Sequence, residues 1–261
     1  MELSTEHDRA KVLYYGDPGV GKSSHLAAVA RLGKVIYIDI EAGLKAQALM
    51  NLGIPISNID VRRLKTFEEV DKFRWDIMSM ASKELPFAIV WDSITEGQQT
   101  LLEIDLSRKA EQALRLKGIS LDQFTYGIDD RGRNSDQTLR LARAFRDMPC
   151  HIGIAALQRE DKDEKSGRLA IGPSLSPKAA GLIMGYMDVV IRAYVDVIDG
   201  QVVYLGQTKP GKIYKAKDRY GLLPPIMVNP TFDRVIAYIN GEMKAADDPE
   251  QTLLELLKKG A

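Results

Sequence analysis

The stretch Gly16-Asp17-Pro18-Gly19-Val20-Gly21-Lys22-Ser23 has the spacing GxxxxGKS and lies between an apolar run at 12–15 and a helix-like run at 25–30. Glycines in such a loop can take positive φ angles, which turn backbone N–H groups toward a phosphate, and the lysine can reach the β- and γ-phosphates. The motif requires a strand before the loop and a helix after it, and a chance glycine-rich turn would lack both. The stretch therefore predicts a nucleoside-triphosphate site.

The whole loop is expected to contact the nucleotide, through Gly16, Asp17, Pro18, Gly19, Val20, Gly21, Lys22, Ser23 and Ser24. The hydroxyl of Ser23 would hold Mg²⁺ beside the phosphates of ATP. A second metal ligand is predicted at Asp92, where the apolar run 87–91 ends in a carboxylate. An aspartate at a strand end is common in α/β folds, so this prediction depends on the phosphate loop that precedes it.

Composition indicates one large globular domain, because 45% of the 261 residues are hydrophobic and 28% are charged. The net charge is zero, so any nucleic-acid binding must come from local clusters of cations. Cys150 is the only cysteine, which excludes an intrachain disulfide. The start of the chain lacks the features of a signal peptide, and no apolar stretch approaches the roughly 18 residues that span a membrane. We expect a cytoplasmic protein without a membrane partner.

Short β-branched runs at 11–15, 34–40, 87–91, 151–157 and 187–195 alternate with helix-like segments. This alternation predicts an α/β fold with a mostly parallel sheet between helices. The Asp199-Gly200 pair predicts a hairpin, and with it an antiparallel extension of the sheet. We expect a core over 1–240, followed at 241–261 by a linker and an amphipathic helix that begins near Asp248-Pro249.

Hydrolysis needs a residue that orients or deprotonates water, and Ser93, which follows Asp92, cannot supply a carboxylate. Glu41 is the best candidate, because it ends the next strand after the phosphate loop and would lie beside the γ-phosphate. A solvated loop acid and an acid that contacts the ribose are the alternatives.

With these residues, the chain resembles the RecA-like ATPase core over most of 10–221, and Ile38-Asp39-Ile40-Glu41 matches the strand-end motif that carries the catalytic glutamate. The resemblance implies a RecA-like P-loop NTPase fold. Within that superfamily, the segments 16–24, 91–93 and 216–221 are similar to short phage-encoded nucleotide-binding proteins, including the Sak-type single-strand annealing recombinases.

The resemblance implies roles for three further residues. Gln158, at the end of an apolar strand, would sense the γ-phosphate, and a polar strand-end cap is the alternative. Lys217 and Arg219 resemble a basic element that enters the site of a neighbouring subunit, where cations stabilise charge on the phosphates. That role implies self-association into a ring or filament, whereas a solvated basic hairpin would need none.

Two segments are candidates for binding single-stranded DNA: 118–135, and the polar stretch 159–178, which we expect to be a long loop. Acidic residues offset the cations of the second segment, and it has no aromatic ring on which a base could stack. The candidate contacts are Phe124, Tyr126, Arg131, Arg133, Arg159, Lys162, Lys165 and Arg168.

The leading hypothesis is an ATP- and Mg²⁺-dependent ATPase that binds single-stranded DNA in phage or prophage recombination, by annealing or strand exchange, in the cytoplasm of a bacterial host. A single-strand binding protein is a further candidate partner. The alternative is an ATP-gated protein-interaction module, such as a helicase loader or regulator, which zero net charge favours. A small P-loop kinase is a third reading, against which the Lys217 and Arg219 element argues.

Overall fold

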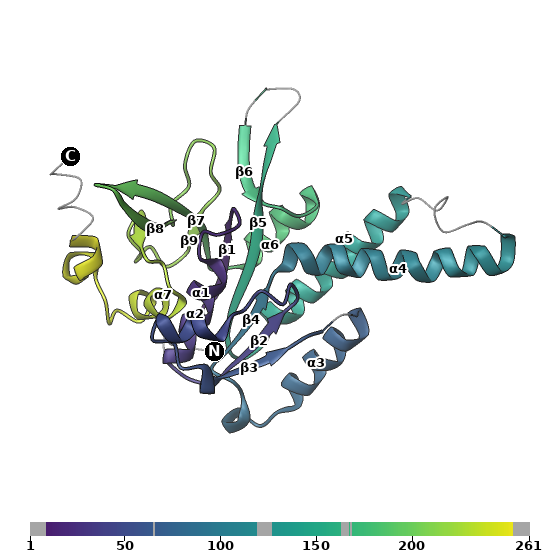
Figure 1. Ribbon diagram of the computed structural model, residues 1–261, viewed down its shortest axis with the longest axis horizontal. Helices are drawn as coiled ribbons and strands as arrows, with labels where there is room; N and C mark the ends of the chain where they lie inside the picture. Colours follow the sequence, from purple (N-terminus) through teal and green to yellow (C-terminus); the bar gives the residue numbers. More distant parts are fainter. Residues whose placement is uncertain (1–8, 65, 119–126, 163–166, 168, 253–261) are drawn as a thin grey trace, which may run out of the picture.

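The computed structural model describes residues 9–64, 66–118, 127–162, 167 and 169–252 (Figure 1). A mixed sheet of ten strands forms its centre, in the order β10-β8-β7-β1-β5-β4-β2-β3, with β6 added to β5 and β9 to β7. The strands are β1 (Lys11–Gly16), β2 (Val35–Asp39), β3 (Ile59–Arg62), β4 (Ala88–Asp92), β5 (His151–Lys162), β6 (Leu169–Pro173), β7 (Val189–Ile198), β8 (Gln201–Gln207), β9 (Lys217–Asp218) and β10 (Ile226–Val228).

The part of the sheet from β3 to β7 is parallel, as the sequence predicts. The phosphate-loop strand β1 and the Asp92 strand β4 are separated by β5 alone. Strand β1 is buried along its whole length, because helices cover both faces of the sheet. The edge strand β3 was not predicted; its burial is low, so it lacks the apolar run that marked the others.

A layer of helices covers each face of the sheet, and alternate side chains of β1 pack against the two layers. Leu13 and Tyr15 pack in a cluster with α3 to α6, whereas Val12 and Tyr14 pack in a cluster with α1, α2 and α7. The helices are α1 (Lys22–Ala27), which continues as a 3-10 turn over Ala28–Arg31, α2 (Ala46–Asn51), α3 (Phe67–Ser79), α4 (Ile94–Lys117), α5 (Ile128–Arg146), α6 (Pro177–Tyr186) and α7 (Phe232–Ile239). None of the helices described here is long and apolar enough to cross a membrane.

The antiparallel extension is confirmed. Asp199 (φ 51°) and Gly200 (φ 76°) join β7 to β8 in a tight hairpin, and both have the positive φ that a type I′ turn requires. Strand β10 then adds to β8 in antiparallel register.

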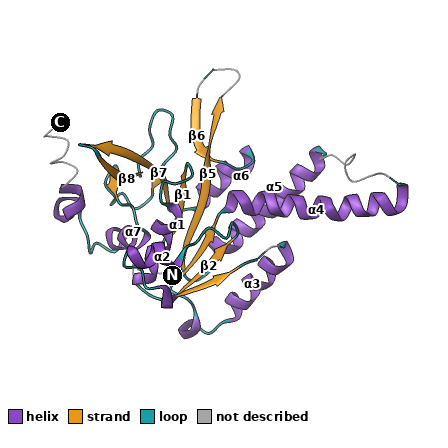
Figure 2. Cartoon of the chain, viewed as in Figure 1, coloured by secondary structure: helices purple, strands orange, loops and turns teal. Residues whose placement is uncertain are grey.

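The prediction of a long loop over 159–178 is wrong. Strand β5 continues to Lys162, and β6 returns beside it in antiparallel register, so the segment forms a hairpin that projects from the sheet (Figure 2). Helix α6 already begins at Pro177. The outer half of this hairpin leaves the core and carries polar side chains, so it has none of the apolar alternation by which we recognised strands.

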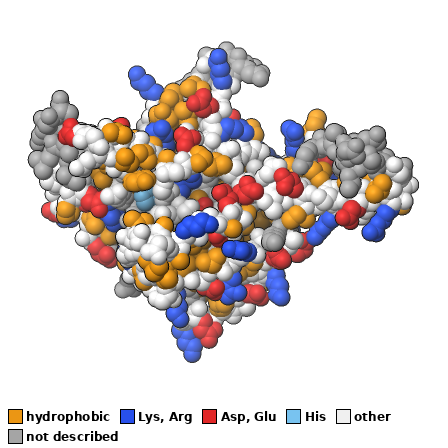
Figure 3. Space-filling model, viewed as in Figure 1, with side chains coloured by type: hydrophobic (Ala, Val, Ile, Leu, Met, Phe, Trp, Pro, Cys, Tyr) orange, Lys and Arg blue, Asp and Glu red, His pale blue; other side chains and the backbone are white. Residues whose placement is uncertain are grey.

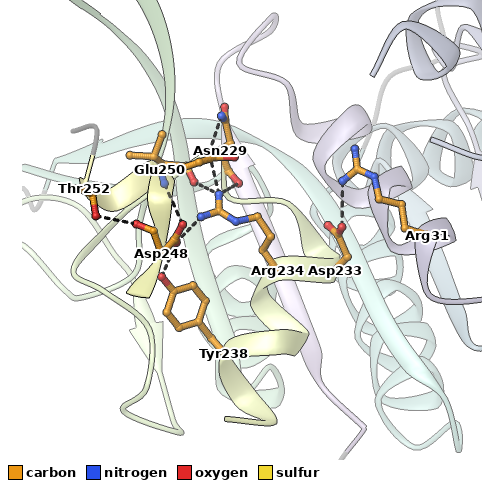
Figure 4. A network of polar contacts seen from close by, with 9 residues as sticks. Arg31, Asn229, Asp233, Arg234, Tyr238, Asp248, Glu250 and Thr252 are labelled. Atoms are coloured by element: carbon orange, nitrogen blue, oxygen red, sulfur yellow. Dashed lines mark hydrogen bonds and ion pairs between the residues drawn. The ribbon is translucent and has the colours of Figure 1, made fainter. Parts of the chain in front are cut away.

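The segment after α7 packs back onto the core through a polar network (Figure 4). Buried Asp248 accepts hydrogen bonds from Arg234, from the Tyr238 hydroxyl (2.6 Å) and from the backbone N–H of Glu250 (3.1 Å). The Glu250 carboxylate accepts from Asn229 (2.7 Å) and Arg234 (3.0 Å). Residues 249–252 are helical, as predicted; the rest of the predicted C-terminal helix lies outside the described residues, and the domain boundary at 240 stays a prediction.

Candidate nucleotide site

The phosphate loop begins where β1 ends, and glycine is required at its positions for different structural reasons. A Cβ on Gly16 would lie 2.2 Å from the carbonyl oxygen of Ala193, so the close approach of β7 admits only glycine. Gly19 (φ 83°) and Gly21 (φ 82°) are left-handed, a conformation that L side chains rarely adopt. The N–H of His25 then bonds to the carbonyl of Gly21 at 2.8 Å and starts the helix.

Lys22 lies folded over this loop with 9% of its surface exposed. Its Nζ donates to the carbonyls of Gly16 (3.0 Å) and Asp17 (2.7 Å). Burial lowers the pKa of Lys22, and the carboxylates of Asp92, Glu41 and Asp17 oppose that shift. The ammonium group of Lys22 is therefore held among carboxylates, at the loop where it would contact the phosphates of a bound nucleotide.

Ser23 and Asp92 meet, as the predicted metal site requires. Asp92 ends β4 and is buried; its carboxylate accepts hydrogen bonds from the Ser23 hydroxyl and, at 2.6 Å, from the hydroxyl of Tyr37. Burial raises the pKa of Asp92, and these two hydrogen bonds oppose the rise. Tyr37 was missed, because a tyrosine inside a strand is indistinguishable in sequence from ordinary core.

The Ser23–Asp92 pair fits Mg²⁺ bound together with a nucleotide. Within the described residues no group of three or more His, Cys, Asp and Glu side chains could hold a metal. Mg²⁺ is commonly bound through one or two protein oxygens, with phosphates and water completing its six ligands. A hydroxyl and one carboxylate match that arrangement.

Glu41 lies beside the pair, two residues after the end of β2. Strands β2 and β4 are parallel neighbours with Asp39 opposite Asp92, and the hydroxyl of Ser93 donates to Oε1 of Glu41 at 2.6 Å. Buried Asp39 accepts the N–H groups of Gly43 (3.0 Å) and Leu44 (3.3 Å), and so fixes the turn that carries Glu41. Glu41 itself is exposed, so water can reach its carboxylate.

Gln158 lies on β5, which is a neighbour of β1 in the sheet, and contacts the phosphate loop. Strand β5 pairs with β1 in parallel, with Leu157 opposite Gly16, and Nε2 of Gln158 donates to the Asp17 carboxylate at 2.7 Å. The structure thus brings Lys22, Ser23, Glu41, Asp92 and Gln158 together around one loop.

A cavity of about 300 Å³ opens beside the same loop, toward β8. It is lined by Gly21 and Ser24 of the phosphate loop and by His25, Tyr204 and Thr231, among others. Burial lowers the pKa of His25 to about 4, so its ring is neutral. Among the described residues, neither Nδ1 of His25 nor the hydroxyl of Thr231 has a hydrogen-bond partner. Sequence reasoning did not find this cavity.

Lys217 and Arg219 lie away from the phosphate loop of their own chain. Strand β9 pairs with the start of β7, whereas the loop follows the end of the parallel strand β1. Lys217 donates to three carbonyls at the end of α6, the shortest to Met187 (2.5 Å), and Arg219 forms an ion pair of 2.6 Å with Asp188. Their predicted role in a neighbouring subunit stays a prediction.

The DNA-binding candidates are only partly brought together. Arg131 of α5 and Arg159 of β5 line one cleft of about 480 Å³, where Glu96 lies with them. Arg159 also pairs with Asp161 at 2.5 Å. Arg133 is exposed on the second turn of α5, and Lys162 ends β5. Phe124, Tyr126, Lys165 and Arg168 lie outside the described residues.

A phosphate loop of this form on β1, with Asp92 on β4 and the single strand β5 between them, is the arrangement of a P-loop NTPase. Residues 8–220 match the family described as AAA domain, and the chain belongs to that family. The family implies a nucleotide-binding protein of the ATPase class. No curated protein sequence matches the chain. Among solved structures, a KaiC-like protein from the archaeon Pyrococcus horikoshii OT3 is similar at 14% identity and a TM-score of 0.41, with 76% of each chain covered.

Proposed function

We propose that the chain hydrolyses ATP with Mg²⁺, and that Glu41 orients the attacking water. The observation that carries this proposal is the hydrogen bond from Ser93 to Oε1 of Glu41, which holds a solvent-accessible carboxylate beside Asp92 and Lys22. With one oxygen bonded to Ser93, the other oxygen of Glu41 is available to accept a proton from water.

In this proposal the other residues of the site bind the metal ion, the phosphates and the base of ATP. Ser23 and Asp92 would hold Mg²⁺, which neutralises charge on the phosphates when bound. Lys22 would exchange the carbonyls of Gly16 and Asp17 for phosphate oxygens. The base would enter the cavity at His25 and Tyr204.

We further propose that the ATPase acts on single-stranded DNA in phage or prophage recombination. The similarity of three motifs to Sak-type recombinases supports this role, as does the cleft shared by Arg131 and Arg159, because Arg159 directly follows Gln158 on β5. Gln158 would then couple nucleotide and DNA through its bond to Asp17.

Hydrolysis measured against protein concentration, with and without a single-stranded oligonucleotide at two salt concentrations, tests the proposal. DNA should stimulate turnover, and added salt should weaken the stimulation, because phosphate contacts release counterions. A rate that rises faster than linearly with protein would support the trans role of Lys217 and Arg219. A rate that is linear and indifferent to DNA would contradict the recombination role.

One observation favours the second candidate, an ATP-gated protein-interaction module. Helices α4 and α5 extend as an arm beyond the sheet (Figure 1), and near the end of that arm Leu116 is 81% and Ile128 is 90% exposed. Large apolar side chains on such an arm suit a protein partner. Leu116→Ser with Ile128→Ser should leave DNA-stimulated hydrolysis unchanged if the recombination role holds.

A further inference from the structure

A cleft of about 890 Å³ lies apart from the nucleotide site, between β6, α6 and the segment 210–217. Its volume is in the range of ligand-binding pockets. Apolar side chains line part of it, including Leu169, Met184, Val190 and Ile213. Neither the fold nor the nucleotide site requires an opening here.

The charge on this cleft is strongly one-sided. Among the residues that the structure describes, the charged ones that line it are Lys162, Lys212, Lys215 and Lys217, with a single acid, Asp161. The whole chain carries 36 basic and 36 acidic residues, so four lysines with one acid form a local excess. Figure 3 shows basic side chains on the projecting end of the molecule, where the β5–β6 hairpin stands, with acidic and hydrophobic side chains beside them.

Three of these lysines are available to a ligand. Asp161 is engaged with Arg159, and within the described part of the chain no carboxylate forms an ion pair with Lys162, Lys212 or Lys215. Lys217, by contrast, is engaged with the carbonyls at the end of α6.

The lysine-bearing segment is fixed to the sheet. The N–H of Ile171 bonds to the carbonyl of Ile213 at 2.7 Å, and the N–H of Lys215 bonds to the carbonyl of Ile171 at 3.0 Å. The stem of Lys215 lies against β6, where a Cβ on Gly172 would be 3.1 Å from its Cδ. The hydroxyl of Tyr15 donates to the carbonyl of Lys215 at 2.5 Å, and Tyr15 directly precedes the phosphate loop.

We propose that this cleft binds a segment of single-stranded nucleic acid, with phosphates at Lys162, Lys212 and Lys215 and with sugars and bases over the apolar lining. The proposal rests on the proposed action on single-stranded DNA and names a site for it. A single strand fits both properties of the cleft, since it offers phosphates together with exposed base faces. A duplex keeps its base faces stacked inside. Tyr15 and Gln158 connect the cleft to the phosphate loop through β1 and β5.

The test is fluorescence anisotropy of a labelled oligo-dT over a series of salt concentrations, with the full chain. Lys212→Gln with Lys215→Gln removes two of the proposed phosphate contacts. The matched control is Lys72→Gln with Lys83→Gln, which removes two exposed lysines on and after α3 and gives the same change in net charge. The cleft variant should bind roughly 25-fold more weakly at 0.1 M salt, with a salt slope shallower by about 1.4, because each contact with a single strand contributes about 0.7. The control should bind like the wild type.

The outcomes distinguish a failure of the cleft as the binding site from a failure of the proposed DNA binding. Wild-type affinity and slope in the cleft variant would overturn the cleft and leave DNA binding intact. A wild type that binds no oligo-dT at low salt would overturn both. An equal loss of affinity for a duplex of the same length would overturn the single-strand assignment. The ATP-induced thermal shift of each variant shows that it is folded, and Lys162→Gln provides an independent third position.

Discussion

The hydroxyl of Ser93 donates a 2.6 Å hydrogen bond to Oε1 of Glu41, which joins the ends of β4 and β2. Ser93 follows Asp92, so the bond fixes Glu41 relative to the proposed metal ligand. The same hydroxyl accepts the N–H of Glu96 at 3.2 Å and caps α4, so the helix in turn holds Ser93 in place. A serine after Asp92 thus positions a carboxylate that comes from the neighbouring strand.

Glu41→Gln should keep nucleotide binding and lose turnover. Glutamine has the same size and can still accept the hydrogen bond from Ser93, but it cannot take a proton from water. We expect turnover to fall by about 10²- to 10⁴-fold, the usual contribution of general base catalysis. Steady-state hydrolysis and titration with a fluorescent ATP analogue measure the two quantities. Glu111→Gln, an exposed site far along α4, is the control, and equal turnover in the two variants would assign the base elsewhere.

Lys22→Ala should abolish the thermal shift that Mg·ATP produces. In the wild type, ATP at about 100 times its dissociation constant stabilises the fold by about 2.7 kcal/mol. Without nucleotide, the variant should be no less stable than the wild type, because burial disfavours the charged lysine, as its lowered pKa indicates. Melting temperatures with and without Mg·ATP test both statements. An unchanged shift would mean that ATP binds somewhere other than this loop.

Gln158→Ala should leave stability nearly unchanged while it removes the response of hydrolysis to single-stranded DNA. Its hydrogen bond to Asp17 is exposed, so we expect the free energy of unfolding to change by about 1 kcal/mol or less. The ratio of turnover with DNA to turnover without it is the diagnostic measurement. A variant with the wild-type ratio would show that Gln158 is only a polar cap at the end of the core strand.

Asp248→Asn should destabilise the chain by about 2 kcal/mol. The substituted side chain lacks the charge opposite Arg234, whose side chain is only 13% exposed, and it offers one acceptor oxygen fewer to the three donors around it. Glu250 still pairs with Arg234, which limits the loss. Urea unfolding measures it, with exposed Asp247→Asn as the control. Equal stability of the two variants would mean that this network does not hold 248–252 on the core.

The parallel part of the fold was predictable because its strands are buried on both faces and therefore appear as apolar runs. The edge strand β3 and the outer half of the β5–β6 hairpin do not meet that condition, since much of their surface faces solvent. Their strand character comes from pairing with a neighbour, which local sequence does not encode.

The candidate site divides in the same way. Lys22, Ser23 and Asp92 belong to motifs with fixed local spacing, and Glu41 and Gln158 follow the apolar runs 34–40 and 151–157 that the alternation identified. Ser93, Tyr37, Tyr204 and Thr231 join the site through sheet register and long-range packing, so no local pattern marks them. The Lys212–Lys215 segment was not predicted to line a site for the same reason. Its position beside β6 depends on two long-range backbone hydrogen bonds.

Two buried histidines should make the fold sensitive to acid. Burial lowers the pKa of His25 and of His151 from 6.5 to about 4. Nδ1 of His151 accepts the N–H of Ala10 at 3.1 Å, which requires a ring that is unprotonated at that nitrogen. Between these pKa values the unfolded chain binds more protons than the folded chain, so stability is present above about pH 6.5 and is lost as the pH falls toward 4.

His151→Asn isolates one of these contributions, because the carboxamide oxygen of asparagine can still accept the N–H of Ala10 but does not titrate. Near pH 5 each histidine should contribute a slope of up to about 1.4 kcal/mol per pH unit to the free energy of unfolding. The variant will be less stable at neutral pH, since it loses the ring that stacks on Phe87 at 4.7 Å. Its stability should nevertheless fall less steeply between pH 6.5 and pH 4.5, by about that slope. Urea unfolding at closely spaced pH values gives both curves, and parallel curves would show that His151 titrates normally in the folded chain.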